Sequence, residues 1–141
     1  MTQEHKDLLL KDLCTRLPYG VKVEYNSEMY GVLGIAHGRA LLCKPLSSIT
    51  EKDCPLIEDV KPYLFPLSSI TEEQKNELRE MEWSFDNSTI CNIIECFGTY
   101  RAYVDHSCCS ELIDWFIKNH IDYRGLIPKG LANDATGLNI Y

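Results

Sequence analysis

Five residues in the second half of the chain have side chains suited to metal binding or nucleophilic chemistry. They are two cysteines in an apolar segment and a histidine followed by two adjacent cysteines: Cys91, Cys96, His106, Cys108 and Cys109. Zinc takes thiolate and imidazole ligands in tetrahedral geometry. The spacing is poor for such a site, because Cys91 and Cys96 are an odd number of positions apart and would face opposite sides of a strand. We therefore expect no metal and no cofactor, and keep Cys91, Cys96, His106 and Cys108 as the fallback zinc candidates.

Nucleophilic catalysis is the second chemistry open to these residues. His106 with Cys108 or Cys109, close to a predicted helix N-terminus, would lower a thiol pKa. No third residue that would orient the histidine can be identified, and the sequence has no G-x-S-x-G, P-loop, G-x-G-x-x-G or H-E-x-x-H motif. We therefore expect that the protein is not an enzyme, with a small cysteine- or zinc-dependent enzyme as the alternative.

A short polar segment near the C-terminal end could form a recognition loop. It combines an acid, a phenol and a guanidinium beside Gly125, and two further cations could contact an anion. The residues predicted to bind a ligand are Arg124, Lys129, Arg101, Tyr123 and Asp122. The structural interpretation, which we favour, is an Asp–Arg pair with Gly125 as the turn that leaves a helix.

A seven-residue phrase, PLSSITE, occurs at residues 45–51 and again at residues 66–72. In the second copy Thr71 and Gln74 have the spacing of a capping box and predict a helix entrance. We interpret the pair as a duplicated turn-and-cap element. The alternative is an anion site at the helix N-terminus, formed around Ser68, Ser69 and Thr71, although the acidic residues that follow oppose it.

Composition describes one ordinary globular domain. The 141 residues are 45% hydrophobic and 25% charged, and the formal net charge is −7. Residues 51–82 hold nine acidic and four basic residues, a net charge of −5. An acidic chain lacks the basic footprint of a general nucleic-acid binder, so we expect no direct contact with nucleic acid. The acidic third is either a solvated surface or a face that occupies a basic site on a partner.

The chain begins without a basic segment followed by an apolar core, and no apolar run approaches the length of a membrane span. Seven cysteines are an odd number, which argues against a disulfide scaffold. We expect a soluble protein of the cytoplasm with no membrane contact, in which most cysteines are buried thiols.

Residue periodicity predicts helices at both ends of a small sheet. Residues 3–17 form an amphipathic helix that Pro18–Tyr19–Gly20 ends, with Lys6, Asp7, Lys11 and Asp12 facing water. Alternation then predicts a meander of three short strands, with turns at residues 26–28 and 37–38. A fourth strand fits residues 57–64, where Pro62 confines it to an edge or a strand end.

The second half should add a helix from Thr71 to about Glu82, a hairpin over residues 89–104 and a strong helix up to Ile121. The predicted fold is therefore α+β: a small antiparallel sheet of SH3-like size with an N-terminal helix, a capped middle helix and a long C-terminal helix. We expect a single domain, residues 1–141, with two lobes, 1–65 and 66–141, as the alternative division. The last segment should dock on the protein by its apolar residues.

Three phrases of the chain carry a resemblance. They are Met1–Cys14 continued by Leu17–Val21, Val60–Glu73, and Asp122–Ala132. In these phrases the chain resembles a group of short uncharacterised proteins from phages and prophages of gut Bacteroides. The resemblance implies an accessory protein of a mobile element, at work in the cytoplasm of a bacterial host cell, and it implies no activity for individual residues. The upstream PLSSITE copy, at residues 45–51, departs from the group, which usually has a single copy.

Resemblance and composition together predict a protein that acts by binding. Its partner would be a host protein or a small anionic signalling ligand, and countering host defence is one role that fits. A purely structural phage or mobile-element protein is a further alternative, and so is a homo-oligomer with a ligand site between subunits. The two binding modes differ in charge, because a mimic of nucleic acid uses acidic residues 51–82 and an anion site uses cations such as Arg124.

Overall fold

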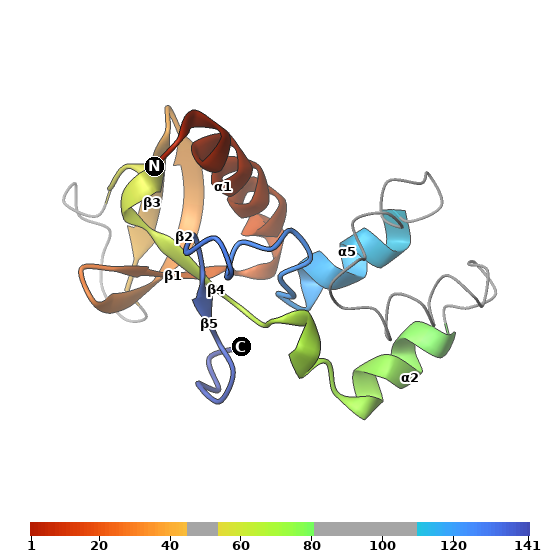
Figure 1. Cartoon of the computed structure of the whole chain (residues 1–141). Helices are drawn as coiled ribbons and strands as arrows, with labels where there is room; N and C mark the ends of the chain where they lie inside the picture. The colour runs from red at the N-terminus through yellow and green to blue at the C-terminus, as the bar shows by residue number, and fades with distance from the viewer. Residues whose placement is uncertain (45–53, 81–109) are drawn as a thin grey trace.

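The computed structural model describes residues 1–44, 54–80 and 110–141, and Figure 1 shows how their elements are arranged. The helices are α1 (Gln3–Arg16), α2 (Glu72–Glu80) and α5 (Ser110–Lys118). The strands are β1 (Lys22–Tyr25), β2 (Glu28–Ala36), β3 (Arg39–Cys43), β4 (Lys61–Leu64) and β5 (Asn133–Asp134). The 3₁₀ helices are η1 (Leu17–Tyr19), η3 (Ile57–Asp59) and η4 (Leu67–Ser69). The predicted hairpin over residues 89–104 lies outside the described residues.

Helix α1 begins at Gln3 as the sequence predicts and ends at Arg16, one residue earlier than predicted. Thr2 caps its N-terminus, where the Thr2 hydroxyl accepts a hydrogen bond of 3.2 Å from the His5 amide. Leu9 and Leu13 are fully buried against the sheet. The chain leaves α1 through η1 and turns at Gly20, whose φ of 71° is a left-handed conformation that glycine adopts without strain.

Strands β1, β2 and β3 form the predicted antiparallel meander. Both of its turns contain two consecutive residues with positive φ: Asn26 and Ser27 between β1 and β2, then His37 and Gly38 between β2 and β3. Paired positive φ angles match the right-handed twist of the strands that they join. The register shifts once, between Val32 and Gly34.

The segment from residue 54 to residue 64 closes this meander into a curl. Its first part pairs with β3, since Ala40 donates to Pro55 and Ile57 donates to Gly38 through backbone atoms, at 3.0 and 2.9 Å. After η3 its second part, β4, pairs antiparallel with β1. One short segment therefore contacts the two outer strands of the meander.

The sheet is mixed, which corrects the prediction of an antiparallel sheet. Its strand order is β3-β2-β1-β4-β5, and β5 runs parallel to β4. The prediction failed because β5 is two residues long and comes from the irregular C-terminal segment. Pro62 lies in β4 and not at a sheet edge: β1 pairs with Lys61 and Pro62, while β5 pairs with Tyr63 and Leu64. Pro62 is the second residue of β4, so its missing amide lies next to a strand end, which the sequence allowed as the alternative to an edge.

In the described part of the second half, the short helices α2 and α5 pack together at the right of Figure 1. The capping box that begins α2 is as predicted, with Gln74 N donating to the Thr71 hydroxyl and Thr71 N donating to the Gln74 side chain, at 3.2 and 3.0 Å. The prediction of a long C-terminal helix was wrong. Helix α5 has nine residues and ends at Lys118, because His120 takes a φ of 56° that no α-helix continues.

Within residues 1–44, 54–80 and 110–141, buried apolar side chains form three clusters. The first lies between α1 and the curled sheet, and the second joins η4, α2 and α5. The third lies under the C-terminal segment and consists of Leu64, Leu126, Leu131 and Ala132, which confirms that this segment docks. Among the described residues, no helix is long and apolar enough to cross a membrane.

Candidate functional site

The exit of helix α5 is where the sequence-predicted site residues of the C-terminal segment gather. The backbone leaves α5 in a Schellman turn: His120 N donates to Ile117 O at 3.1 Å and Ile121 N donates to Phe116 O at 2.9 Å. His120 is the left-handed residue of this turn. Asp122, Tyr123, Arg124 and Lys129 follow it, whereas Arg101, Cys91, Cys96, His106 and Cys108 lie outside the described residues.

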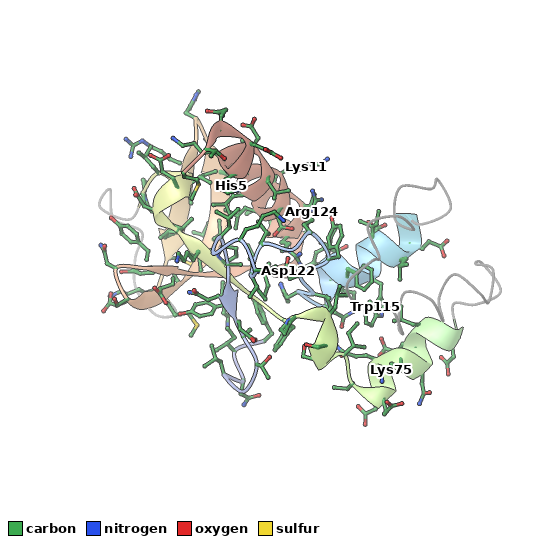
Figure 2. All side chains as sticks on the ribbon, viewed as in Figure 1. His5, Lys11, Lys75, Trp115, Asp122 and Arg124 are labelled. Atoms are coloured by element: carbon green, nitrogen blue, oxygen red, sulfur yellow. The ribbon has the colours of Figure 1, made fainter. Side chains whose placement is uncertain are left out.

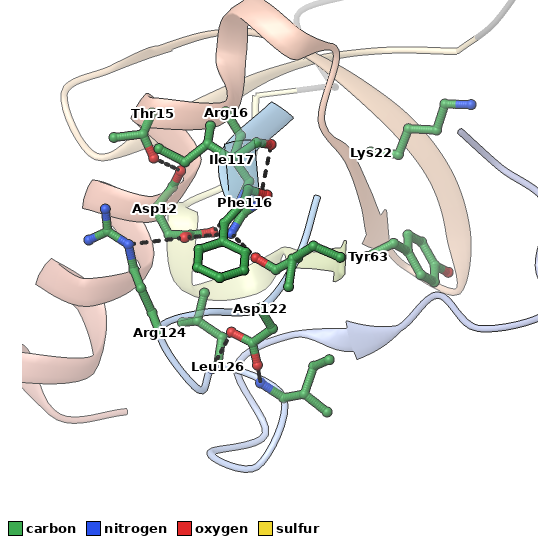
Figure 3. Close-up of polar contacts among 12 residues, drawn as sticks. Asp12, Thr15, Arg16, Lys22, Tyr63, Phe116, Ile117, Asp122, Arg124 and Leu126 are labelled. Carbon is green, nitrogen blue, oxygen red and sulfur yellow. Dashed lines mark hydrogen bonds and ion pairs between the residues drawn. The ribbon is translucent and has the colours of Figure 1, made fainter. Parts of the chain in front are cut away.

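Arg16, from the end of α1, holds the exit of α5 (Figure 3). Its guanidinium donates to Ile121 O at 2.8 Å and reaches Ile117 O and Phe116 O at 3.4 and 3.5 Å. It also forms a bidentate pair with Asp12, with N–O distances of 2.8 and 3.1 Å. Arg16 and Asp12 are both fully buried, so this cation replaces water for the carbonyl groups at the helix end.

Arg124 approaches the same carboxylate from the C-terminal loop. Its Nε lies 3.3 Å from Asp12 Oδ1, although the direction is not that of a hydrogen bond, and its guanidinium covers the Tyr123 ring at 4.8 Å from the centroid. Tyr123 stacks on Phe116 and is buried, and its hydroxyl has no hydrogen-bond partner among the described residues. Burial raises the pKa of this phenol. The predicted Asp–Arg pair therefore joins Arg124 to Asp12 and not to Asp122.

Asp122 organises the loop that follows. Its two carboxylate oxygens accept hydrogen bonds from Leu126 N and Ile127 N, both at 2.8 Å. Burial raises the pKa of Asp122, and the two backbone hydrogen bonds work in the opposite direction. Gly125, with a φ of 69°, makes the turn inside this loop, so it is a turn residue but not the helix exit that the sequence suggested.

Lys129 lies at the far side of the same loop. Its ammonium group donates to Gly125 O at 3.1 Å and lies 3.5 Å from Arg124 O. The cation is thus directed at carbonyl oxygens of its own loop. Gly125 is needed here because a Cβ at this position would lie 3.3 Å from Lys129 Nζ and the φ is left-handed.

A cleft of about 250 Å³ separates this loop from the second PLSSITE copy, and we call it the Asp122 cleft. It is lined by Pro66, Leu67, Ser68, Asp122, Gly125, Ile127 and Pro128. It brings together Asp122 and Ser68, which the sequence assigned to two separate candidate sites. Its walls are mainly apolar, and Asp122 is the ionisable residue among them.

The proposed anion site at the α2 entrance has less free hydrogen-bonding capacity than the sequence suggested. The Ser69 hydroxyl donates to Pro66 O at 2.7 Å, and the Thr71 hydroxyl already accepts from Gln74 N. Ser68 is exposed at the rim of the Asp122 cleft. The geometry therefore connects Ser68 to the cleft and assigns Ser69 and Thr71 to local structure.

His120 and Tyr141 form the other side of the α5 exit. Their rings stack with centroids 3.6 Å apart, and the Tyr141 hydroxyl donates to Tyr63 O at 2.8 Å and accepts from Lys22 N at 3.1 Å. The Lys22 ammonium contacts Ile140 O. Burial, helped by the charge of Arg16, lowers the pKa of His120 to about 4, so the ring is neutral near pH 7.

A second cavity of about 300 Å³ lies at the other end of the molecule, between α1, the β2–β3 turn and η3. It is lined by Gln3, Lys6, Asp7, Leu10, His37, Gly38, Leu56, Ile57 and Glu58. Lys6 and Glu58 form an ion pair beside it. In the described ranges no group of three or more His, Cys, Asp or Glu side chains is placed to hold a metal ion.

Sequence reasoning missed Asp12 and Arg16, and it placed Asp12 in water. The missed signal is spacing: Asp12 and Arg16 are four residues apart and lie at helical spacing with Leu9 and Leu13. A charged pair that falls within an apolar stripe predicts a buried ion pair.

Comparisons with protein-family models, with curated proteins and with solved structures found no match to this chain.

Proposed function

We propose that the protein acts by binding another protein, and that the acidic face of α2 contacts a basic surface of that partner. The observation that carries the proposal is the exposure of all four glutamates of this nine-residue helix: Glu72, Glu73, Glu77 and Glu80. An exposed acidic face on an ordered element favours association with a positively charged surface.

The helix is anchored so that its acidic side stays outward. Leu78 is 1% exposed in the cluster with α5, and Glu77 accepts a hydrogen bond of 3.0 Å from the Trp115 indole. Figure 2 shows Lys75 and Trp115 among the side chains of these two helices. Lys75 pairs with Glu72 on the helix surface. A fixed orientation lowers the entropy lost when the partner binds.

The geometry gives a protein partner more support than a small anionic ligand. Arg124 is directed at Asp12 and Lys129 at carbonyl oxygens, so these two of the three predicted cations have internal partners, and Arg101 lies outside the described residues. The ionisable side chain that lines the adjacent cleft is a carboxylate, which repels an anion. The resemblance to phage and prophage proteins would make the partner a protein of the bacterial host, and countering host defence is the role we propose for the interaction.

The test is affinity purification from a bacterial lysate with the tagged protein and with a variant that carries Glu73→Gln and Glu80→Gln. These substitutions remove two negative charges but spare the Glu77–Trp115 hydrogen bond. We expect a bound protein that the variant retains about tenfold less, and that is released between about 0.1 M and about 1 M NaCl, where the Debye length falls from about 10 Å to about 3 Å.

The matched control is Glu4→Gln with Asp59→Asn, which removes the same charge from exposed positions on α1 and η3. It should retain the partner as the wild type does. Equal loss in both variants would mean that net charge and not α2 decides binding. A partner that stays bound to the α2 variant at high salt would contradict the proposal.

A further inference from the structure

Asp122 is a buried carboxylate that forms no ion pair in the part of the chain that the structure describes. The residue is 5% exposed, and its two hydrogen bonds come from neutral amides, Leu126 N and Ile127 N. The two nearby guanidinium groups are directed at Asp12. A buried carboxylate normally has a cationic partner or a metal ion, so Asp122 is an exception that calls for a ligand.

The carboxylate also keeps hydrogen-bonding capacity. Each oxygen of an ionised carboxylate offers two lone pairs, and each Asp122 oxygen uses one of them for a backbone amide. Asp122 is among the residues that line the cleft, so a donor that enters the cleft comes close to it. Figure 3 shows the carboxylate and its contact with the Leu126 amide inside the loop.

The other walls define what kind of group would carry the donor. Pro66, Leu67, Ile127 and Pro128 are apolar, and they surround a volume of about 250 Å³. This volume is below the roughly 300–1,000 Å³ of sites for drug-sized ligands, and so suits one side chain. Lysine matches these walls best, because an apolar four-carbon stem ends in a compact ammonium group that needs one acceptor, whereas arginine needs a planar pair of acceptors.

We propose that the Asp122 cleft binds a lysine side chain of the basic partner protein. This inference rests on the proposed function and adds an anchor to it. Ser68 lies on the cleft and is four residues before Glu72, the first residue of α2, so the cleft and the acidic helix belong to one continuous stretch of surface. The Lys129 ammonium group donates to Gly125 O and therefore does not occupy the cleft itself.

The experiment is a ¹⁵N NMR titration of the whole chain with N-acetyl-lysine methylamide. The reporters are the amides of Leu126 and Ile127, which donate to Asp122. We expect saturable shifts of these two amides, and none with the norleucine analogue, which has the apolar stem without the charge. Equal shifts with both compounds, or none with the lysine compound, would overturn the proposal.

Substitution of Asp122 itself would disturb the loop, so the variants are made at Ser68. Ser68→Trp fills the cleft from its rim, and Ser68→Ala keeps it open. We expect Ser68→Trp to raise the Kd of the lysine compound about tenfold or more, as the loss of a charged hydrogen bond would. Ser68→Ala should leave this Kd unchanged. A Ser68→Trp protein that binds the lysine compound normally would place the binding elsewhere.

The same variants separate this inference from the proposed function. If Ser68→Trp weakens binding of the captured partner as well as binding of the lysine compound, the ammonium group in the cleft comes from the partner. If it abolishes binding of the compound but leaves the partner bound, the cleft takes free amines and the lysine assignment is wrong. The α2 variant Glu73→Gln with Glu80→Gln should still bind the compound, since its cleft is intact.

Discussion

At the scale of residues, the Arg16 side chain connects α1 to the exit of α5. It neutralises Asp12 and completes the end of a helix that lies 100 to 105 positions further along the chain. Asp12 in turn faces two guanidinium groups, those of Arg16 and Arg124. Removal of Arg16 leaves the buried Asp12 carboxylate with Arg124 alone, whose contact is not a hydrogen bond. This cost is larger than the net contribution of the intact pair.

Arg16→Met should therefore lower the free energy of unfolding by about 3–5 kcal/mol. The double variant Asp12→Leu with Arg16→Met should lose less, because no buried carboxylate remains unpaired. Urea denaturation of the two proteins measures the difference. Lys11→Met, an exposed position on the same helix, is the control and should change stability by less than about 0.5 kcal/mol. An Arg16→Met effect as small as that of Lys11→Met would refute the assigned role.

His120 gives the protein a pH dependence whose sign follows from its lowered pKa. The unfolded chain binds the proton near pH 6.5 and the folded one only at about pH 4, so the stability that neutral His120 contributes is lost as pH falls from 6.5 to 4. A pKa difference of this size corresponds to roughly 3 kcal/mol. Unfolding measured from pH 7 to pH 4 should show the loss, and His120→Phe should lack it.

The raised pKa of Asp122 acts in the other direction at the acidic end of this range, because the folded protein then binds the proton more readily than the unfolded chain. The difference between wild type and His120→Phe isolates the histidine. A proton NMR titration of the His120 ring provides the independent check. A midpoint near pH 6.5 in the folded protein would contradict the assignment.

At the scale of elements, the sequence predicted those whose local signals agree. Thr71 and Gln74 predict the capping box of α2, turn residues at 26–28 and 37–38 predict the meander, and the Leu9–Leu13 stripe predicts α1. The sequence could not predict β5, because two residues carry no period. It overextended α5 because His120 and Ile121 continue the apolar stripe, while the turn at His120 is stabilised by Arg16 and Tyr141 from distant segments.

The segment from residue 135 to residue 141 depends on its last aromatic ring. Residues 136–139 are exposed, and Tyr141 anchors them by the stack on His120 and by two hydrogen bonds of its hydroxyl. Burial of the hydroxyl end raises the pKa of Tyr141 to about 12, although 42% of the residue stays exposed. The Tyr141 side chain therefore connects β1, β4 and the α5 exit.

Tyr141→Phe should cost about 1–2 kcal/mol for the two hydrogen bonds, and Tyr141→Ala about 1 kcal/mol more for the lost stack. Tyr141→Ala should also raise the pKa of His120 toward 6.5, because water reaches the ring. Thermal unfolding and NMR titration measure the two effects. Tyr141→Phe keeps the stack, so in that control the His120 pKa should stay near 4. An unchanged His120 pKa in Tyr141→Ala would contradict the inference that Tyr141 shields the His120 ring from water.

At the scale of the whole molecule, three separate apolar clusters are joined by polar contacts that the sequence did not reveal. The Arg16 contacts cross from α1 to α5, and the Phe65 backbone exchanges hydrogen bonds of 2.9 and 2.8 Å with His120 and Asp122. The candidate site was predicted in part: Asp122 and Ser68 were both named, but their meeting in one cleft depends on long-range packing. No local pattern encodes that meeting.

These long-range contacts of Arg16 and Phe65 predict that the protein unfolds as one cooperative unit. Trp115 reports on the helical cluster, and the sheet signal in circular dichroism reports on the curl; Trp83→Phe leaves Trp115 as the single tryptophan. The two urea transitions should coincide in midpoint. They should separate in Arg16→Met if this side chain carries the coupling, and two transitions in the parent protein would contradict a single unit.

The long reach of Arg16 also affects how the chain is made. The carbonyl groups that it binds are synthesised 100 to 105 residues after it, which at about 5–20 residues per second is roughly 5–20 s of translation. During that time α1 can form with Asp12 and Arg16 four residues apart on one helix, so the cation already has a counter-ion before its distant partners emerge from the ribosome. The buried pair thus serves the nascent chain as well as the finished protein.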